Sequence, residues 1–286
     1  MTHTPHTIVA KKKLSADVYQ MTFKAPYIVE ARKAGQFLII QIDSNFGERI
    51  PLTIAHANDE EGTITIIFQA VGKTTLLLAQ KEVGDELANV LGPLGTPTEI
   101  HKVGTVVCVG GGIGVAPMHP IVQALKKAGN KVIVIMGARN KDLLILEEEM
   151  KVLADELIIC TDDGSYGRKD LVTVPLKELC ASGTVNEVFA IGPPIMMKFC
   201  AETTRPFGIQ TMVSLNTIMV DGTGMCGGCR VNVGGDTKFV CVDGPEFDGH
   251  KVDFDNMMLR LKAYKGQEAE ATHKCRVGVD PKEVQK

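Results

Sequence analysis

Three of the eight cysteines gather in one glycine-rich stretch near the C-terminal end of the chain. Two residues separate Cys226 from Cys229, and eleven separate Cys229 from Cys241. Closely spaced thiolates of this kind bind iron–sulfur clusters or zinc. The surrounding glycines let a loop wrap a cluster and direct backbone N–H groups at its sulfur atoms, which tunes the reduction potential. We therefore expect a small metal-bearing lobe within residues 221–249.

The cysteine spacing favours a [2Fe–2S] cluster with one unusual ligand. A plant-type cluster uses the pattern C-x4-C-x2-C followed by a distant fourth cysteine. Asp221 stands where the first cysteine of that pattern belongs, and cysteines fill the other three positions. The sequence thus predicts a cluster in which a carboxylate replaces one thiolate, with the metal ligands Asp221, Cys226, Cys229 and Cys241.

Two other sets of ligands stay open. Cys275 could replace Asp221 as the fourth ligand, although it lies 34 positions beyond Cys241 and past an expected helix. A structural zinc ion also takes three cysteines and one further ligand, for which His250 and His273 are the candidates. Zinc would make the chain a non-catalytic assembly module without a chromophore.

A second candidate site is the segment GGGIGVAP at residues 110–117. It lies between an expected strand at 105–109 and an expected helix at 118–128, where free N–H groups and the positive end of the helix dipole favour phosphate. The spacing is G-x-G-x-x-P rather than the ordinary G-x-G-x-x-G, and a purely structural turn is the alternative. We expect this loop to bind a dinucleotide through Gly111, Gly112, Gly114, Val115 and Ala116.

Further strand-end loops belong with the glycine loop, because ligands of open α/β sheets bind at the carboxyl ends of the strands. The candidates are Gly137, Arg139, Asp162, Asp163, Gly192, Pro193, Pro194 and Met196. Asp162 or Asp163 could accept hydrogen bonds from a ribose 2′-hydroxyl and would repel a 2′-phosphate, which favours NAD over NADP. Solvated turn residues are the alternative interpretation.

Two motifs in the first hundred residues could bind a pyrophosphate. Arg49 and Thr53 fall on one expected strand, where the guanidinium can make bidentate, charge-assisted bonds. A helix expected to start near Thr74 would supply backbone donors to the same group. A surface arginine and an ordinary helix start would explain each motif alone. The candidates are Arg49, Pro51, Leu52, Thr53, Gln69, Val71, Gly72, Lys73, Thr74 and Thr75.

The order of elements predicts how these sites are assembled. Short β segments at 7–11, 18–23, 37–42, 63–69 and 86–90 indicate an antiparallel barrel. From residue 104, strands at 105–109, 131–136, 156–160, 187–191 and 210–214 alternate with helices at 118–128, 144–154, 174–181 and 196–203, which predicts a doubly wound parallel sheet. We expect an N-terminal barrel at 1–98, an α/β nucleotide-binding domain at 99–215, and a metal-binding lobe with one helix and a charged tail at 216–286.

Composition excludes some classes of function. The net charge of −3 provides no basic field for nucleic acid. No stretch approaches the roughly 18 apolar residues of a membrane span, and the first twenty residues lack a signal-peptide core. We expect a cytoplasmic protein that binds neither nucleic acid nor membrane, with cysteines that act as ligands and core residues.

Taken together, the motifs resemble those of the ferredoxin–NADP reductase superfamily. The resemblance rests on R-x-P-x-T at residues 49–53, G-x-T-T at 72–75, GPLG at 92–95 and G-x-G-x-x-P at 112–117. It implies that FAD binds between the barrel and a nicotinamide-nucleotide domain. The segment GPPIMM at 192–197 is similar to the branch that includes the electron-transfer subunit of dihydroorotate dehydrogenase.

A narrower resemblance comes from residues 218–230 and 243–253, which are similar to the small subunits of NADH-dependent reduced ferredoxin:NADP oxidoreductases. Asp221 departs from the four cysteines of the dihydroorotate dehydrogenase subunit. The resemblance implies hydride exchange between NAD(H) and FAD, and single-electron transfer through a [2Fe–2S] cluster, with no catalytic side chain. It also implies a heterodimer with a larger iron–sulfur flavoprotein subunit that handles ferredoxin and NADP(H) and carries the electron-bifurcating flavin.

The alternatives from the same superfamily are an electron-transfer subunit of dihydroorotate dehydrogenase and a stand-alone NADH:acceptor reductase. Copurification with a larger iron–sulfur flavoprotein would separate these from the small subunit of a bifurcating complex. A yellow preparation would exclude the zinc module, because such modules carry no flavin.

Overall fold

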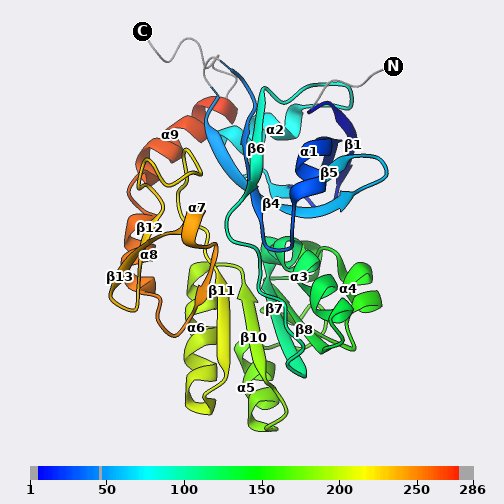
Figure 1. Ribbon diagram of the computed structural model, residues 1–286, viewed down its shortest axis with the longest axis vertical. Helices are drawn as coiled ribbons and strands as arrows, with labels where there is room; N and C mark the ends of the chain where they lie inside the picture. The colour runs from blue at the N-terminus through cyan, green and yellow to red at the C-terminus, as the bar shows by residue number, and fades with distance from the viewer. Residues whose placement is uncertain (1–5, 45–46, 277–286) are drawn as a thin grey trace.

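The computed structural model describes residues 6–44 and 47–276. Its N-terminal part is a six-stranded antiparallel sheet in the spatial order β1-β2-β5-β4-β3-β6. Figure 1 shows this sheet in the upper half of the molecule. The strands are β1 (Ile8–Lys13), β2 (Val18–Lys24), β3 (Phe37–Gln41), β4 (Arg49–Asn58), β5 (Thr63–Gln69) and β6 (Asn89–Leu94).

The N-terminal sheet closes on itself, as the predicted barrel requires. The backbone N–H of Ile8 donates to the carbonyl of Asp85 at 2.9 Å, and that of Leu87 donates to the carbonyl of His6 at 3.2 Å. Closure removes open edges along this side. The bridge at this position, between Thr7 and Glu86, is isolated, so β6 begins at Asn89 and not at residue 86.

Strand β6 also extends further than the sequence indicates. Its last residues, Gly92 to Leu94, fall in a segment that the sequence places at a domain boundary. A proline has no N–H to donate, and Pro93 is tolerated here because it falls at the irregularity in the β3–β6 register, between Leu91 and Leu94. Two helices complete the barrel: α2 (Lys73–Gln80), which the sequence predicts, and α1 (Pro26–Ala31), which it does not.

The second sheet has the order β14-β11-β10-β7-β8-β9, in which β11, β10, β7, β8 and β9 are parallel. These strands are β7 (Thr105–Gly111), β8 (Lys131–Ala138), β9 (Glu156–Thr161), β10 (Glu187–Ile191) and β11 (Gln210–Ser214). The chain reverses its direction of winding between β7 and β10, which is where ligands of open sheets bind. The predicted parallel sheet is therefore confirmed.

Helices cover both faces of the parallel sheet, as a doubly wound fold requires. Alternate residues of β7 point to opposite faces of the sheet and pack with different helices. Val106 and Cys108 pack with α3 and α4, whereas Val107 and Val109 pack with α5 and α6. The bounds are α3 (Val115–Lys127), α4 (Glu147–Leu153), α5 (Thr173–Ala181) and α6 (Pro194–Thr204), with 3-10 turns η1 (Gly112–Gly114), η2 (Lys141–Leu143) and η3 (Arg205–Phe207).

The C-terminal segment contains a small hairpin and short helices (Figure 1). These are β12 (Arg230–Val233), β13 (Asp236–Phe239), α7 (Val240–Asp243), α8 (Phe254–Arg260) and α9 (Lys265–Arg276). Between them, β14 (Glu246–Asp248) pairs antiparallel with β11 and so joins the parallel sheet. Through this strand the C-terminal segment is tied to the α/β sheet. The division into three domains stays a prediction.

Helix α9 occupies part of the tail that the sequence describes only as charged. It has no apolar stripe, but Lys274 and Glu270 form an ion pair at 2.6 Å with helical spacing. The helix packs against α2, so the end of the described chain returns to the barrel. Among the helices of the described residues, none has the length and apolar character to cross a membrane. The cytoplasmic location stays a prediction.

Candidate functional site

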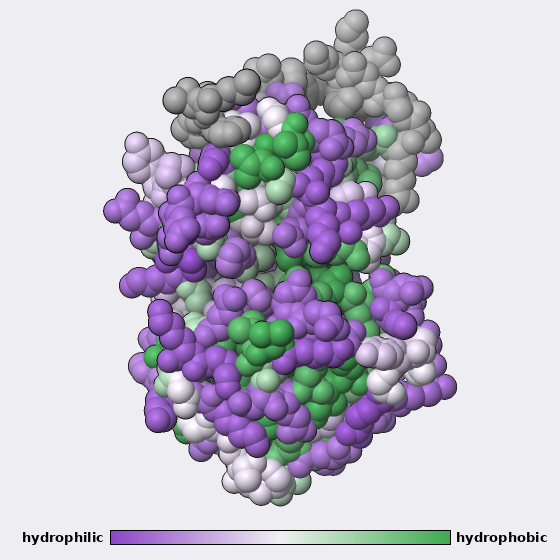
Figure 2. All heavy atoms as spheres, turned by 90° about the vertical axis from the view of Figure 1, so that its right-hand side faces the viewer, coloured by the Kyte–Doolittle hydropathy of each residue, from purple (hydrophilic) through white to green (hydrophobic). Residues whose placement is uncertain are grey.

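A cavity of about 590 Å³ lies between the barrel and the carboxyl ends of the parallel strands. Helix α3 packs against β4 of the barrel beside it, and Val18, Ala55 and Ile67 of the barrel join its apolar core. On the face shown in Figure 2, apolar residues lie in the band between the two halves of the molecule and continue over the lower half. Predicted nucleotide-binding residues that line the cavity are Pro51, Leu52, Thr53, Gln69, Val71, Thr75, Gly111, Gly114, Ala116, Gly192, Pro193 and Pro194.

The glycine loop forms one wall of this interdomain cavity. Gly112 has a φ of +55°, and a Cβ added there would meet no atom within 4 Å, so its free side is open. Gly114 is closed in instead, because a Cβ would lie 2.2 Å from the carbonyl oxygen of Ile191. Gly114 therefore permits close packing, whereas Gly112 leaves room for a pyrophosphate to approach the backbone. Val115, although predicted as a ligand, is buried in the core.

On the barrel side, the start of α2 faces the cavity. The Thr75 hydroxyl accepts hydrogen bonds from the N–H groups of Val71 and Gly72, at 3.1 and 3.0 Å. Thr74 is engaged with Glu48 through its hydroxyl. Arg49 is exposed, and no ion pair within the described residues holds its guanidinium. These features fit a phosphate group held by Arg49 and helix-terminal amides.

The loops after β8 and β9 lie next to each other, outside the lining of the interdomain cavity. The N–H of Asp163 donates to the carbonyl of Arg139 at 3.2 Å, and the Asp163 carboxylate accepts from the N–H of Ser165 at 2.9 Å. Hydrogen bonds from Ser165 lower the pKa of Asp163. No hydrogen bond within the described residues engages the side-chain carboxylate of Asp162. Asp162 is thus the carboxylate more available to a ribose.

Two predicted ligands have packing roles in the structure. A Cβ on Gly137 would lie 2.3 Å from Cγ1 of Val172, so this glycine permits close approach of a neighbouring loop. The Met196 sulfur packs against Gly111, where an added Cβ would lie 2.4 Å from it. Neither residue lines the interdomain cavity. Besides Val115, Asp162 and Asp163, the other predicted residues outside its lining are Arg49, Gly72, Lys73, Thr74, Gly112 and Arg139. Nucleotide contacts for all of these residues remain predictions.

The sequence prediction missed the segment that begins with the last residue of β11. Ser214, Leu215, Asn216, Thr217 and Met219 line the interdomain cavity. Their position at the carboxyl end of a parallel strand is the signal that could have identified them, because the other strand-end loops were assigned by that rule. This segment leads directly to Asp221.

The four predicted metal ligands form two pairs. Oδ1 of Asp221 accepts a hydrogen bond from Sγ of Cys226 at 2.9 Å, and Sγ of Cys229 lies 3.3 Å from Sγ of Cys241. Cys229 and Cys241 are buried, whereas Cys226 is exposed. A two-iron cluster binds two protein ligands at each iron, and this pairing fits that requirement.

The pairing fits a single zinc ion less well. Across residues 6–44 and 47–276, no group of three or more Cys, His, Asp or Glu side chains converges on one metal position. The proposed zinc ligand His250 has another partner, since its Nε2 lies 3.0 Å from the Thr204 hydroxyl. Cys275 lies on α9, and within the described residues no hydrogen bond joins its thiol to the three clustered cysteines. The donor set therefore fits an iron–sulfur cluster.

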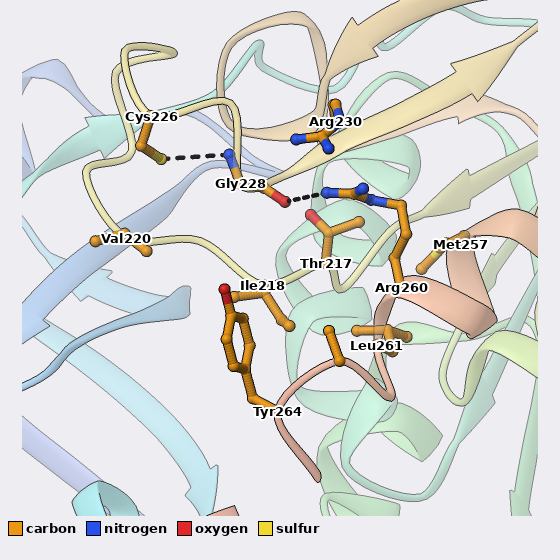
Figure 3. Close-up of a pocket in the computed structure, with 11 residues that line it drawn as sticks. Thr217, Ile218, Val220, Cys226, Gly228, Arg230, Met257, Arg260, Leu261 and Tyr264 are labelled. Carbon is orange, nitrogen blue, oxygen red and sulfur yellow. Dashed lines mark hydrogen bonds between the residues drawn. The ribbon is translucent and has the colours of Figure 1, made fainter. Parts of the chain in front are cut away.

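The loop between Cys226 and Cys229 is held from outside by two arginines (Figure 3). Arg230 donates to the carbonyl of Gly227 at 3.0 Å, and Arg260 donates to the carbonyl of Gly228 at 3.2 Å. With the carbonyls turned outward, the N–H of Gly228 lies 3.4 Å from Sγ of Cys226. Amide N–H groups directed at ligand sulfur stabilise the reduced cluster, in which the negative charge is larger.

The predicted metal ligands differ in the pKa of their side chains when no metal is bound. Hydrogen bonds from the Cys226 thiol and the Thr223 hydroxyl hold the pKa of Asp221 well below its usual range. Burial raises the pKa of Cys241 to about 12. Binding of iron must therefore displace a proton from Cys241, whereas the Asp221 carboxylate is already ionised.

Comparison with known proteins gives matches to both halves of the site. Residues 216–253 match the family model described as the iron–sulfur cluster binding domain of dihydroorotate dehydrogenase B, and residues 108–202 match the oxidoreductase NAD-binding domain. A dihydroorotate dehydrogenase B (NAD(+)) electron transfer subunit homolog from Thermotoga maritima is 48% identical, with 91% of this chain and 92% of the relative covered. The corresponding subunit of Bacillus caldolyticus is 34% identical, with 86% and 96% covered.

A solved structure of an NADH-dependent reduced ferredoxin–NADP oxidoreductase is similar over almost the whole chain. That protein carries out flavin-based electron bifurcation. The TM-score is 0.90 and the identity 45%, with 96% of this chain and 99% of the other covered. The similarity includes the barrel, the parallel sheet and the cysteine-rich segment together.

Proposed function

Because the chain belongs to the family of dihydroorotate dehydrogenase B electron transfer subunits and their homologues, we propose that it transfers electrons between NAD(H) and a larger flavoprotein subunit. The chain is an oxidoreductase with an NAD-binding domain and an iron–sulfur domain, and its cofactors are FAD, an iron–sulfur cluster and NAD(H). We assign the cluster as [2Fe–2S] from the ligand spacing and the two ligand pairs.

One observation carries this proposal: a single short segment connects the interdomain cavity to the metal ligands. Residues 214–217 line the cavity, and Asp221 follows four positions after Thr217. FAD, when bound, exchanges two electrons with nicotinamide as hydride and releases them singly. The cavity would hold the reacting partners, and the four predicted metal ligands that follow this segment would hold the irons, with no acid or base needed.

The barrel residues bind FAD, and the residues of the α/β domain bind NAD(H). Arg49 and the start of α2 on the barrel bind the pyrophosphate of FAD, and Thr53, four positions after Arg49 on β4, lines the cavity. Gly112 and the start of α3 receive the pyrophosphate of NAD(H). Asp162 prefers a free ribose hydroxyl to a 2′-phosphate, which supports NAD over NADP.

The larger partner is proposed to be an iron–sulfur flavoprotein that handles ferredoxin and NADP(H) within an electron-bifurcating complex. The 45% identity with the bifurcating oxidoreductase structure and the carboxylate at position 221 support this assignment. The alternative, an electron transfer subunit of dihydroorotate dehydrogenase B, is supported by the names of several relatives. Purification from the native host separates the two, since the larger subunit that copurifies either oxidises dihydroorotate or reduces NADP with ferredoxin.

The test of the electron-transfer function is anaerobic purification of the whole chain followed by flavin and iron analysis. We expect about one FAD and about two irons per chain. NADH should bleach the flavin absorbance and then produce the EPR signal of a reduced [2Fe–2S] cluster. A colourless, iron-free protein after reconstitution would contradict the proposal, and so would a cluster that NADH fails to reduce.

A further inference from the structure

Thr217 lies between two cavities. It lines the interdomain cavity of about 590 Å³ and a second cavity of about 340 Å³ that is bordered by Cys226. Of the residues that line these two cavities in the described chain, Thr217 is the one they share. Figure 3 shows it on the side of the second cavity, close to the loop that carries Cys226 and Gly228. Thr217 is therefore positioned where the nucleotide site meets the metal site.

The hydroxyl of Thr217 is buried and has no hydrogen-bond partner within the described residues. Leaving a buried hydroxyl unpaired costs roughly 1–3 kcal/mol, and native proteins rarely retain such groups without a reason. The backbone around it is well fixed, because the N–H of Leu215 donates to the carbonyl of Pro245 at 2.9 Å and Met219 is buried. The unpaired hydroxyl is thus a property of a well-anchored segment, and a partner from outside the chain would satisfy it.

We propose that the hydroxyl of Thr217 hydrogen-bonds to the isoalloxazine ring of FAD in the interdomain cavity, an inference that rests on the proposed function. The polar edge of the isoalloxazine offers nitrogen and oxygen atoms to a hydroxyl in the cavity wall. The pyrophosphate of FAD is assigned to Arg49 and α2 on the barrel, which leaves the ring system for the wall at residues 214–217. Thr217 then contacts the flavin on the side of the chain that leads to the metal ligands.

The proposal predicts opposite effects on the flavin-free protein and on FAD binding. Thr217→Val keeps the shape of the side chain and removes the hydroxyl. In the flavin-free chain it removes an unpaired buried group, so the melting temperature should stay the same or rise. The affinity for FAD should fall about 5- to 10-fold, because one hydrogen bond is lost. Thr217→Ser keeps the hydroxyl and should bind FAD within about twofold of the wild type.

The experiment measures the FAD dissociation constant of the full chain by fluorescence titration and the melting temperature without flavin, with iron content as a check of integrity. Thr204→Val is the matched control, because the Thr204 hydroxyl is buried and paired with the hydroxyl of Thr211 at 2.5 Å. This control should lower the melting temperature and leave FAD affinity unchanged.

Three outcomes would overturn the assignment of Thr217. They are an unchanged FAD affinity in Thr217→Val, an equal loss of affinity in Thr217→Ser, and a lower melting temperature of the flavin-free Thr217→Val protein. The last result would mean that the hydroxyl already has a partner, such as a bound water. A wild-type chain that binds no FAD would instead refute the proposed function together with this inference.

Discussion

The carboxylate of Asp221 lies 2.9 Å from the thiol sulfur of Cys226, in the position that a cysteine occupies in plant-type clusters. Its other oxygen accepts hydrogen bonds from the Thr223 hydroxyl at 2.7 Å and from the N–H of Met225 at 2.9 Å. The loop therefore orients the carboxylate before any metal binds, because three donors fix both of its oxygens. Cys275, on α9, has no comparable link to Cys226 within the described residues.

The first prediction concerns the fourth cluster ligand. Asp221→Ala should abolish or strongly reduce the [2Fe–2S] cluster, because one iron loses a ligand that no neighbouring thiol replaces. Asp221→Cys should retain the cluster with an altered potential, since a thiolate donates more charge to iron than a carboxylate does. EPR of the reduced protein and iron analysis measure both effects. Cys275→Ala is the control and should leave the spectrum unchanged, and the reverse result would identify Cys275 as the ligand.

The second prediction concerns the arginine that α8 contributes to the cluster loop. Arg260→Gln removes a positive charge beside the loop and weakens the bond to the Gly228 carbonyl. The reduced cluster carries more negative charge, so its potential should fall by about 40 mV, the equivalent of roughly 1 kcal/mol for one electron. A redox titration followed by EPR measures this shift.

The control for the Arg260 variant is Arg205→Gln, which removes a guanidinium bound to the carbonyl of His250. This change should leave the potential of the cluster near the wild-type value. Equal shifts in the two variants would show that overall charge, and not the contact with Gly228, sets the potential.

The sequence predicts the parts of the site that short spacing encodes. The spacing of Asp221, Cys226 and Cys229 brings ligands together within one loop, and the position of Gly112 after a buried strand indicates a phosphate loop. Thr217 was missed because it stands out only by lining both cavities. That property depends on the folded chain and is not visible in a local sequence pattern. Helix α1 was missed since its six residues are too short for a helical period to be visible.

Long-range pairing explains the remaining differences. Strand β14 has three residues, and its sequence does not reveal that it adds to the edge of the parallel sheet beside β11. Gly137 resembles a ligand by its position near the carboxyl end of β8, but the side chain of Val172 fills the space next to it. In both cases, residues distant in sequence decide the outcome, and spacing along one segment carries no information about them.

The third prediction concerns Glu246 of β14, whose carboxyl accepts a hydrogen bond from the Thr98 hydroxyl at 2.8 Å. Burial, together with the charge of Glu187, raises the pKa of Glu246 to about 7, although the hydrogen bond from Thr98 opposes the rise. The folded protein therefore holds this proton more tightly than the unfolded chain. Its contribution to stability is present below the unfolded pKa of about 4.3 and is lost as the pH rises towards 7, on the order of 3 kcal/mol in all.

Glu246→Gln should remove this part of the pH dependence, because the amide cannot ionise. Melting temperatures between about pH 5 and about pH 8 should fall less steeply in the variant than in the wild type, and the variant should be the more stable protein at the upper end. The exposed Glu30→Gln is the control and should follow the wild-type curve. Parallel curves for wild type and Glu246→Gln would show that Glu246 ionises in the folded protein as it does in the unfolded chain.

The fourth prediction separates the two reasons for a glycine at position 112. Its φ of +55° disfavours any side chain, and its open side would admit a pyrophosphate. Gly112→Ala should therefore cost about 1 kcal/mol of stability and also weaken NADH binding by about tenfold, because the new methyl group occupies the space of the ligand.

Gly183 has a φ of +73° and equally open surroundings, but it lies between α5 and β10, at the amino end of that strand. Gly183→Ala should show the same loss of stability and normal NADH binding. Urea unfolding and NADH titration of both variants test this, and equal NADH affinities would assign Gly112 a conformational role alone.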